Sequence, residues 1–226
     1  MFDSFLGEGM TAMYLSGIFT TLKITLISTL ISYLIGTPLG VLLYCTDKDG
    51  IFPNRPVNAV VGFIVNILRS VPFMIMLVMT QPISRLLLGT SIGDNAFIFY
   101  LVVAAAPFVA RMVESSFKEV DRGIIEAAQS MGAGNFDIIW KVLLPESKPS
   151  LIIGGAIALT TILGYTPMAQ LVSGGGLGQL AIQYGLYRFQ PKTMYISSLL
   201  LIILVQIMQE VLNRLAKVCD KRIRNK

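Results

Sequence analysis

The sequence has no histidine, only two cysteines and few charged residues. Histidine is the commonest general acid–base residue and a common metal ligand, so its absence leaves an enzyme or a metal centre little material. The cysteines, Cys45 and Cys219, fall near the ends of apolar stretches predicted to face the cytoplasm, where a disulfide is not expected. The sequence therefore predicts no catalytic residue, no metal site and no cofactor.

A nucleotide-binding motif is also missing. The run Gly174-Gly175-Gly176 is not followed by the Gly-Lys-Ser/Thr sequence that a phosphate-binding loop requires. Read from the residues alone, the three glycines indicate the end of a helix and a tight turn. Any reaction driven by ATP would therefore need a partner that binds the nucleotide.

The low charge content points to a membrane. Charged residues make up 14% of the 226 residues, whereas about a quarter is usual for a soluble domain. Hydrophobic residues make up 54%, the mean hydropathy is +0.70, and the apolar residues gather in long runs. These runs predict an all-α integral membrane protein, because a helix satisfies its own backbone hydrogen bonds in lipid. The net charge of +5 is small, so we expect no nucleic-acid partner.

Five stretches are apolar enough to cross a bilayer, and we expect one transmembrane domain over residues 1–226. The spans are predicted at about 17–44, 57–83, 95–113, 149–172 and 193–213. Lys and Arg concentrate in the segments that this plan places inside, and only Arg85, Arg188 and Lys192 fall in segments placed outside. The positive-inside rule then puts the N-terminus outside and the C-terminus in the cytoplasm.

Two charged pairs and one isolated arginine accompany the spans. Arg111 and Glu114, three residues apart, can form an ion pair, and so can Glu210 and Arg214, four residues apart. Arg69 lies inside the second apolar stretch, where a charge costs about 2.5–3.5 kcal/mol on insertion scales. Two interpretations reduce that cost. Either the membrane-deep part begins after Arg69 and the side chain anchors the span at the interface, or Arg69 faces a polar route.

The longest polar segment, 114–148, lies between the third and fourth spans, and its centre carries the clearest pattern. Residues 126–145 read EAAQSMGAGNFDIIWKVLLP. Glu126-Ala127-Ala128 favours a helix, and the glycines at 132 and 134 break it. In the piece that follows, Phe136, Ile139, Trp140 and Leu143 recur at helical spacing and are predicted to share one exposed face. Pro145 is predicted to close that piece. The structural alternative is an amphipathic hairpin on the membrane surface.

This segment resembles the cytoplasmic "EAA" loop of bacterial ABC importer permeases, whose pattern is EAA, three residues, Gly, nine residues and I-x-L-P. Glu126-Ala127-Ala128, Gly132 and Val142-Leu143-Leu144-Pro145 match it, and only Val142 departs from it. The resemblance implies the type I ABC importer permease fold in a bacterial inner membrane. It also implies that the loop docks onto an ATPase subunit through Glu126, Ala127, Ala128, Gly132, Phe136, Trp140, Leu144 and Pro145.

Further stretches are similar to one branch of that family, the permeases for uptake of D- and L-methionine. They are Leu68-Arg69-Ser70-Val71-Pro72-Phe73, the glycine-rich run with the sequence after it to Phe189, and Gly164-Tyr165-Thr166-Pro167-Met168-Ala169, in which Pro167 departs from the branch. The resemblance implies a methionine importer whose fourth span lines the route, with Tyr165, Met168 and Arg69 as candidate route or gate residues. Permeases for another amino acid or an osmoprotectant remain the alternative.

The resemblance also implies the partners. They are two ABC ATPase subunits that bind ATP, an external substrate-binding protein, which the glycine-rich run would contact, and the lipid bilayer. We expect a homodimer, because five spans are few to enclose a route and the glycines of the fourth span suit close helix packing. An integral membrane enzyme or a stand-alone channel is the other class of function. The missing histidines and the scarcity of acids within the spans argue against it.

Overall fold

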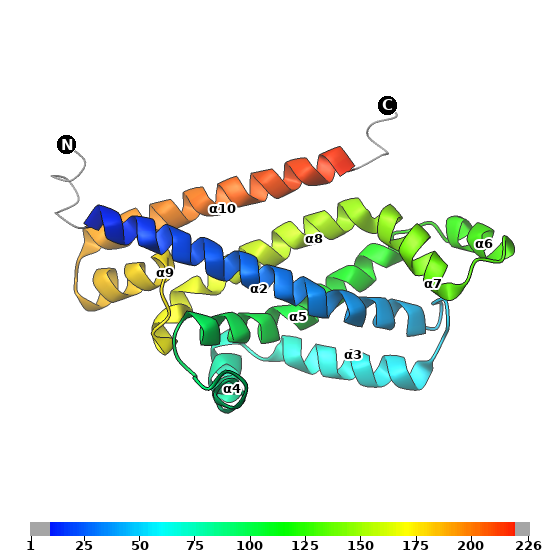
Figure 1. The fold of residues 1–226 in the computed structure, drawn as a ribbon, viewed down its shortest axis with the longest axis horizontal. Coiled ribbons are helices and arrows are strands. Elements are labelled where there is room, and N and C mark those ends of the chain that lie inside the picture. Colours follow the sequence, from blue (N-terminus) through cyan, green and yellow to red (C-terminus); the bar gives the residue numbers. More distant parts are fainter. Residues whose placement is uncertain (1–9, 220–226) are drawn as a thin grey trace. The chain divides into compact units, whose positions relative to one another are not determined.

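The computed structural model describes residues 10–219, and every regular element in that range is helical (Figure 1). Residues 1–9 and 220–226, at the two ends of the predicted transmembrane domain, lie outside the described residues. The elements in chain order are α2 (Met10–Thr46), α3 (Arg55–Ser70), α4 (Phe73–Leu88), α5 (Asp94–Lys118), α6 (Arg122–Ser130), α7 (Asn135–Ile138), the π turn η1 (Ile139–Leu143), α8 (Leu144–Tyr165), the 3₁₀ turn η2 (Thr166–Val172), α9 (Leu177–Leu180), the π turn η3 (Ala181–Tyr187) and α10 (Pro191–Cys219).

Four stretches within residues 10–219 are long and apolar enough to cross a membrane: α2, α5, α10 and Asn135–Val172, the run that contains α8. The bent pair of α3 and α4 makes a fifth if the two helices are counted as one span. Helix α2 alone has 37 residues and is therefore about 55 Å long, well beyond the hydrocarbon core of about 30 Å. The all-helical class and the number of apolar spans agree with the sequence analysis.

The second predicted span, 57–83, is not one straight helix. Helix α3 ends at Ser70, α4 begins at Phe73, and their axes differ by 112°. Val71 between them is extended, with φ −80° and ψ 123°, because Pro72 disfavours the helical conformation in the residue before it. The single stretch of the sequence prediction is therefore corrected to two helices with a sharp bend directly after Arg69.

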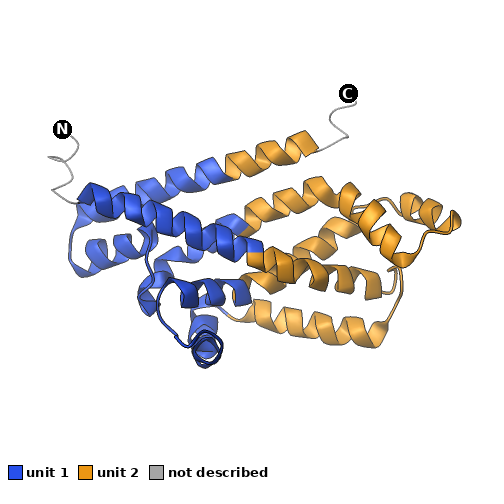
Figure 2. Ribbon diagram, viewed as in Figure 1, with its two compact units in different colours: residues 1–30, 72–103, 159–208 blue, residues 31–71, 104–158, 209–226 orange. Residues whose placement is uncertain are grey.

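The described chain forms two compact units, coloured separately in Figure 2. The second unit comprises Ile31–Val71, Ala104–Ala158 and Gln209–Lys226. In this unit α2 and α5 pack closely: an added Cβ at Gly36 would come within 2.7 Å of Val109, and one at Gly40 within 2.5 Å of the Ala110 carbonyl oxygen. The two glycines thus serve helix–helix contact, the role that small residues have in membrane proteins.

The first unit comprises Met1–Leu30, Pro72–Val103 and Leu159–Met208. Its apolar packing includes a buried cluster of Tyr14 with Leu177 and Leu180, so the short helix α9 is held against α2. The sequence after the glycine-rich run, between the fourth and fifth predicted spans, is helical in part, through α9 and η3. Pro167, which had no explanation in the sequence, stands at the start of η2, where the α-helical hydrogen bonding of α8 has ended.

Candidate functional site

The segment between α5 and α8 contains two helical pieces joined at glycine, as predicted. Helix α6 begins after Asp121, whose carboxylate accepts a hydrogen bond from the Gly123 amide at 2.7 Å. It ends at Ser130, and Gly132 has φ +80°, a left-handed conformation that glycine adopts without a Cβ penalty. The Gly132 amide donates to the Gln129 carbonyl at 2.9 Å, which closes the turn.

The residues of the EAA motif divide between surface and interior. Glu126, Ala127 and Gly132 are exposed, whereas Ala128 is buried, 6% exposed. Ala128 packs in a cluster that also contains Val113 and Phe117 of α5. One side of α6 is thus fixed to the body of the second unit while the other side, with Glu126, faces outward.

The apolar face predicted for Phe136, Ile139, Trp140 and Leu143 is wrong in part. Phe136 and Trp140 are 73% and 57% exposed, and their ring centroids lie 6.0 Å apart, but Leu143 is fully buried and Ile139 is half-buried. The cause is the π turn η1, Ile139–Leu143, in which the regular helical spacing changes. Phe136 and Trp140 therefore form the outward face, while Leu143 packs inward with Ile138.

Pro145 does not close the second piece, which corrects the sequence prediction. The chain passes from α7 through η1 directly into α8, and Pro145 is exposed at the second position of α8. The helical hydrogen bonding continues up to this point, since the Leu144 amide donates to the Ile139 carbonyl, so Pro145 removes one backbone hydrogen bond from a continuous helical segment without ending it. Leu144, half-buried, packs against the same cluster as Leu143. The outward face of α7 and η1 is thus joined to the membrane-crossing helix α8 without an intervening loop.

Five charged side chains hold the base of this segment, and we call them the charged clamp: Asp47, Asp49, Glu114, Lys118 and Arg122. The Glu114 side chain is 9% exposed and accepts from Lys118 Nζ at 2.8 Å. Lys118 also bridges to Asp47 at 2.9 Å, and Arg122 at the start of α6 lies 3.4 Å from Asp49. The hydrogen bond from Lys118 lowers the pKa of Asp47, which lies in the turn after α2.

Arg111 joins the clamp to α3. Its Nη1 donates to Glu114 Oε2 at 2.7 Å, which is the predicted i,i+3 pair, and its Nη2 donates to Asn66 Oδ1 at 2.9 Å and to the Gly62 carbonyl at 3.2 Å. The predicted pair of Glu210 and Arg214 is also present, at 2.6 Å, but it is exposed. The clamp and Arg111 together tie α3, α5, α6 and the turn after α2 to one another.

The three candidate route residues lie in different elements. Tyr165 ends α8 and stacks on Phe73, with ring centroids 4.4 Å apart and 12° between the planes. Met168 lies one turn later in η2 and is half-buried. Arg69 lies in the last turn of α3 and is exposed. Tyr165 and Met168 belong to the first unit and Arg69 to the second.

The glycine-rich run is locked in place by what we call the glycine clasp: Thr21, Asp94, Gly175, Gly176, Leu177 and Gly178. The Gly175 amide donates to Asp94 Oδ1 at 2.8 Å, and the Leu177 amide donates to Thr21 Oγ1 at 2.9 Å. Gly176 has φ +110°, and an added Cβ at Gly178 would lie 2.6 Å from the Pro167 nitrogen. The positive φ of Gly176 and the crowding at Gly178 each favour a residue without a side chain, in agreement with the tight turn that the glycines alone indicate.

Sequence reasoning missed several residues that position these elements. Thr21, on the inner side of α2, also donates to the Gly17 carbonyl at 2.8 Å, and Tyr33 donates to the Leu151 carbonyl of α8 at 3.0 Å. Asp94 is the first residue of α5, and its carboxylate accepts from the Gly175 amide. A hydroxyl or a carboxylate beside an apolar span signals that it needs a partner, but no local pattern identifies a partner more than 80 residues away.

Comparison with known proteins agrees with these features. Residues 36–225 match the family model described as binding-protein-dependent transport system inner membrane component. The chain belongs to this family. It is accordingly a multi-pass protein of a bacterial inner membrane and a component of a transport system, which confirms the family resemblance that the EAA motif carried.

Individual members of the permease family are similar over most of the chain. A probable D-methionine transport system permease protein of Vibrio cholerae is 44% identical over 208 residues, 92% of each chain. The methionine import system permease protein of Bacillus subtilis is 40% identical over 181 residues, 80% of this chain and 82% of that protein. A solved structure of the MetNI methionine ABC transporter in an inward-facing conformation contains a chain with 42% identity and a TM-score of 0.93, which covers 95% of this chain and 100% of that one.

Proposed function

We propose that this chain is the membrane-spanning subunit of an ATP-driven importer for methionine. The observation that carries the proposal is the agreement in sequence and fold with proteins named as methionine transport permeases, over nearly the full length of both chains. The flexible, apolar methionine side chain suits a route with residues such as Met168 and Tyr165. The chirality of the preferred substrate is a question for the transport assay.

The energy comes from two ATPase subunits that bind ATP, and this chain has no catalytic role. The docking surface consists of α6, the Gly132 turn and the outward face of α7 and η1. Phe136 and Trp140 support this role, because large exposed aromatic side chains on a polar segment are typical anchors of protein interfaces. The buried residues Ala128 and Leu143 support this role as well. They pack in one cluster with residues of α5 and α8, so a movement of the docking surface would be transmitted to these helices.

The subunit acts as a homodimer, with its N-terminus outside, its C-terminus in the cytoplasm and an external substrate-binding protein as a further partner. Membrane-crossing helices with large exposed apolar side chains need lipid or another chain to cover them, and α10 exposes Leu199, Ile203 and Ile207. Single cysteines at positions 154–164 of α8 should crosslink like chains in membranes. Robust transport by a monomer would contradict the dimer.

Transport in a defined system tests the substrate. The permease, its ATPase subunits and the substrate-binding protein are reconstituted in proteoliposomes, and accumulation of radiolabelled D- and L-methionine is followed with and without ATP. We expect ATP-dependent methionine uptake that needs the binding protein. ATP-dependent uptake of another amino acid or of an osmoprotectant, without methionine uptake, would show that the chain belongs to an importer for that substrate. Uptake without ATP would indicate a channel.

A further inference from the structure

A cavity of about 320 Å³ in the second unit is lined by residues of α3, α5 and α8. Its volume falls within the range of about 300–1,000 Å³ that is usual for small-molecule sites. Residues of both signs of charge, hydroxyl groups and large apolar side chains line it. The clamp and the docking surface of α6 and α7 do not account for it, so its lining calls for a separate explanation.

The cavity wall includes one cation and one anion that form no ion pair with another residue in the described part of the chain. Arg69 at the end of α3 and Glu119 just after α5 both line it, and neither has an ion pair within residues 10–219. The second arginine in the wall, Arg111, is already held by Glu114, Asn66 and the Gly62 carbonyl. Arg69 lies in the last turn of α3, and the side chains of Arg69 and Glu119 are both exposed, so a ligand that enters the cavity can reach them. Arg69 and Glu119 are thus available for a ligand that carries both charges.

The rest of the wall is apolar and fits a flexible, uncharged side chain. Phe108 and Met112 come from α5, and Ile153 and Ile157 from α8. Gly154 leaves room for Met112, since an added Cβ there would lie 3.1 Å from the Met112 methyl carbon. A polarizable thioether beside an aromatic ring makes favourable contacts with sulfur-containing and aliphatic groups alike.

The geometry points to this cavity as a low-affinity binding site for a zwitterionic α-amino acid with an apolar side chain. Arg69 binds the carboxylate, because the planar guanidinium matches a carboxylate with two parallel hydrogen bonds. Glu119 accepts from the ammonium group, and Met112 with its apolar neighbours holds the side chain. This assignment rests on the proposed function, since it gives the transported substrate a resting place within the permease.

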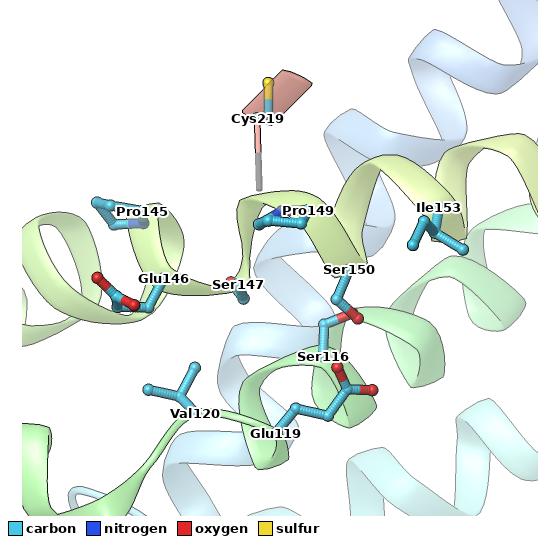
Figure 3. A pocket seen from close by; sticks show the side chains of 10 residues that line it. All are labelled: Ser116, Glu119, Val120, Pro145, Glu146, Ser147, Pro149, Ser150, Ile153 and Cys219. Carbon is cyan, nitrogen blue, oxygen red and sulfur yellow. The ribbon is translucent and has the colours of Figure 1, made fainter. Parts of the chain in front are cut away.

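A second cavity, of about 340 Å³, is shown in Figure 3 and shares part of its wall with the first. Ser116, Glu119, Ser150 and Ile153 line both cavities. The Ser150 hydroxyl donates to Ser116 Oγ at 3.0 Å, so the shared wall joins α5 to α8. Glu146 lines only the second cavity. The two glutamates are therefore a matched pair, of which only Glu119 reaches the proposed site.

Equilibrium binding tests the site in the permease–ATPase complex, without nucleotide, in nanodiscs of phosphatidylglycerol, which has no zwitterionic headgroup to compete. The probes are L-methionine, methionine amide, which lacks the carboxylate, and 4-(methylsulfanyl)butanoate, which lacks the ammonium. Loss of one charge-assisted hydrogen bond corresponds to about tenfold or more in affinity. We expect saturable binding of methionine by the wild type, and binding of each analogue weaker by about that factor.

The variants assign each charge to its residue. Arg69→Gln should weaken methionine binding about tenfold but leave the affinity for methionine amide nearly unchanged. Glu119→Gln should also weaken methionine binding about tenfold, but it should leave the affinity for 4-(methylsulfanyl)butanoate unchanged, because that probe has no ammonium group. Glu146→Gln and Lys148→Gln, which remove a charge outside the cavity, should leave all three affinities as in the wild type. Arg69→Lys, which keeps the positive charge, replaces Arg69→Gln if that variant does not assemble.

Several results would overturn the site. They are undetectable methionine binding by the wild type, equal affinity for the three probes, unchanged methionine affinity in both cavity variants, and equal losses in the two controls. Uptake of methionine in proteoliposomes separates the two claims. If any of these results is found while ATP-driven methionine uptake is normal, the binding site is refuted and the importer function stands. If the complex takes up no methionine, the proposed importer function is itself refuted.

Discussion

The glycine clasp and the charged clamp fix parts of the two units by opposite means. The clasp depends on close approach. The backbone of Pro167 occupies the space that a side chain at position 178 would need, and the backbone amides of Gly175 and Leu177 donate to Asp94 and Thr21. The clamp depends on charge, with Glu114 between two cations and Lys118 between two carboxylates. The clasp should therefore be sensitive to added volume, and the clamp to lost charge.

Volume at the clasp is expected to have the largest effect. Gly178→Ala would put a Cβ within 2.6–2.9 Å of the backbone of Thr166 and Pro167, which cannot move as the end of a side chain can. We expect a loss of about 3 kcal/mol in the free energy of unfolding, or failure to accumulate folded protein. The thermal midpoint in detergent and the monodisperse yield measure it.

Gly155→Ala is the matched control for the clasp variant. A Cβ added at Gly155 in α8 would lie 3.5 Å or more from the Tyr33 side chain of α2, which is an ordinary van der Waals distance. We expect unchanged or slightly higher stability, because alanine loses less backbone entropy than glycine in a helix. Equal losses in the two variants would show that the clasp is no tighter than an ordinary helix contact.

Charge at the clamp is expected to have the next largest effect. Glu114→Gln leaves Arg111 and Lys118 without their shared carboxylate, and the expected loss in unfolding free energy is about 1.5–3 kcal/mol. Glu210→Gln makes the same chemical change in an exposed pair with Arg214, where solvent already screens the interaction. Thermal midpoints of the two variants are compared, and an equal shift would refute a special role for Glu114.

The smallest effect concerns pH. Because the pKa of Asp47 is lowered below its ordinary value of 3.8 in the folded protein, mainly by the hydrogen bond from Lys118, the bridge stabilises the fold above that value. Its contribution is lost as the pH falls through the lowered pKa. Thermal midpoints of the wild type and Asp47→Asn should differ at about pH 7 and converge as the pH falls below the lowered pKa of Asp47. A constant difference over that range would show that the bridge does not supply the stability.

The sequence was sufficient for the all-helical membrane class and for the short-range charge pairs. A long apolar run must satisfy its backbone hydrogen bonds within the lipid, which a helix does. The charge pairs three and four residues apart follow from helical spacing. The break after Ser70 was only half visible: Pro72 indicated a boundary, but a bend of 112° depends on what packs against each helix. The contacts of Thr21 and Asp94 join segments 156 and 81 residues apart, which no local pattern specifies.

The outward face of the docking surface shows why a periodic pattern has limits. Regular helical spacing placed Leu143 on the same face as Phe136 and Trp140, and the π turn η1 moved it to the interior. Nothing in the residues Ile139–Leu143 marks a π turn. In contrast, the turn at Gly132 was predictable, because a glycine between two helix-forming stretches is the ordinary signal for a left-handed turn.

The central claim is that the Gly132 turn is where the ATPase subunit docks. Gly132→Glu adds bulk and charge there, and Gly89→Glu is its matched control, because both glycines have positive φ, 80° and 74°, and no atom within 4 Å of an added Cβ. ATPase copurification and ATPase activity stimulated by loaded binding protein are measured for both. We predict that Gly132→Glu inserts into the membrane but loses both properties, while Gly89→Glu still copurifies the ATPase. Normal copurification and stimulation with Gly132→Glu would contradict the account.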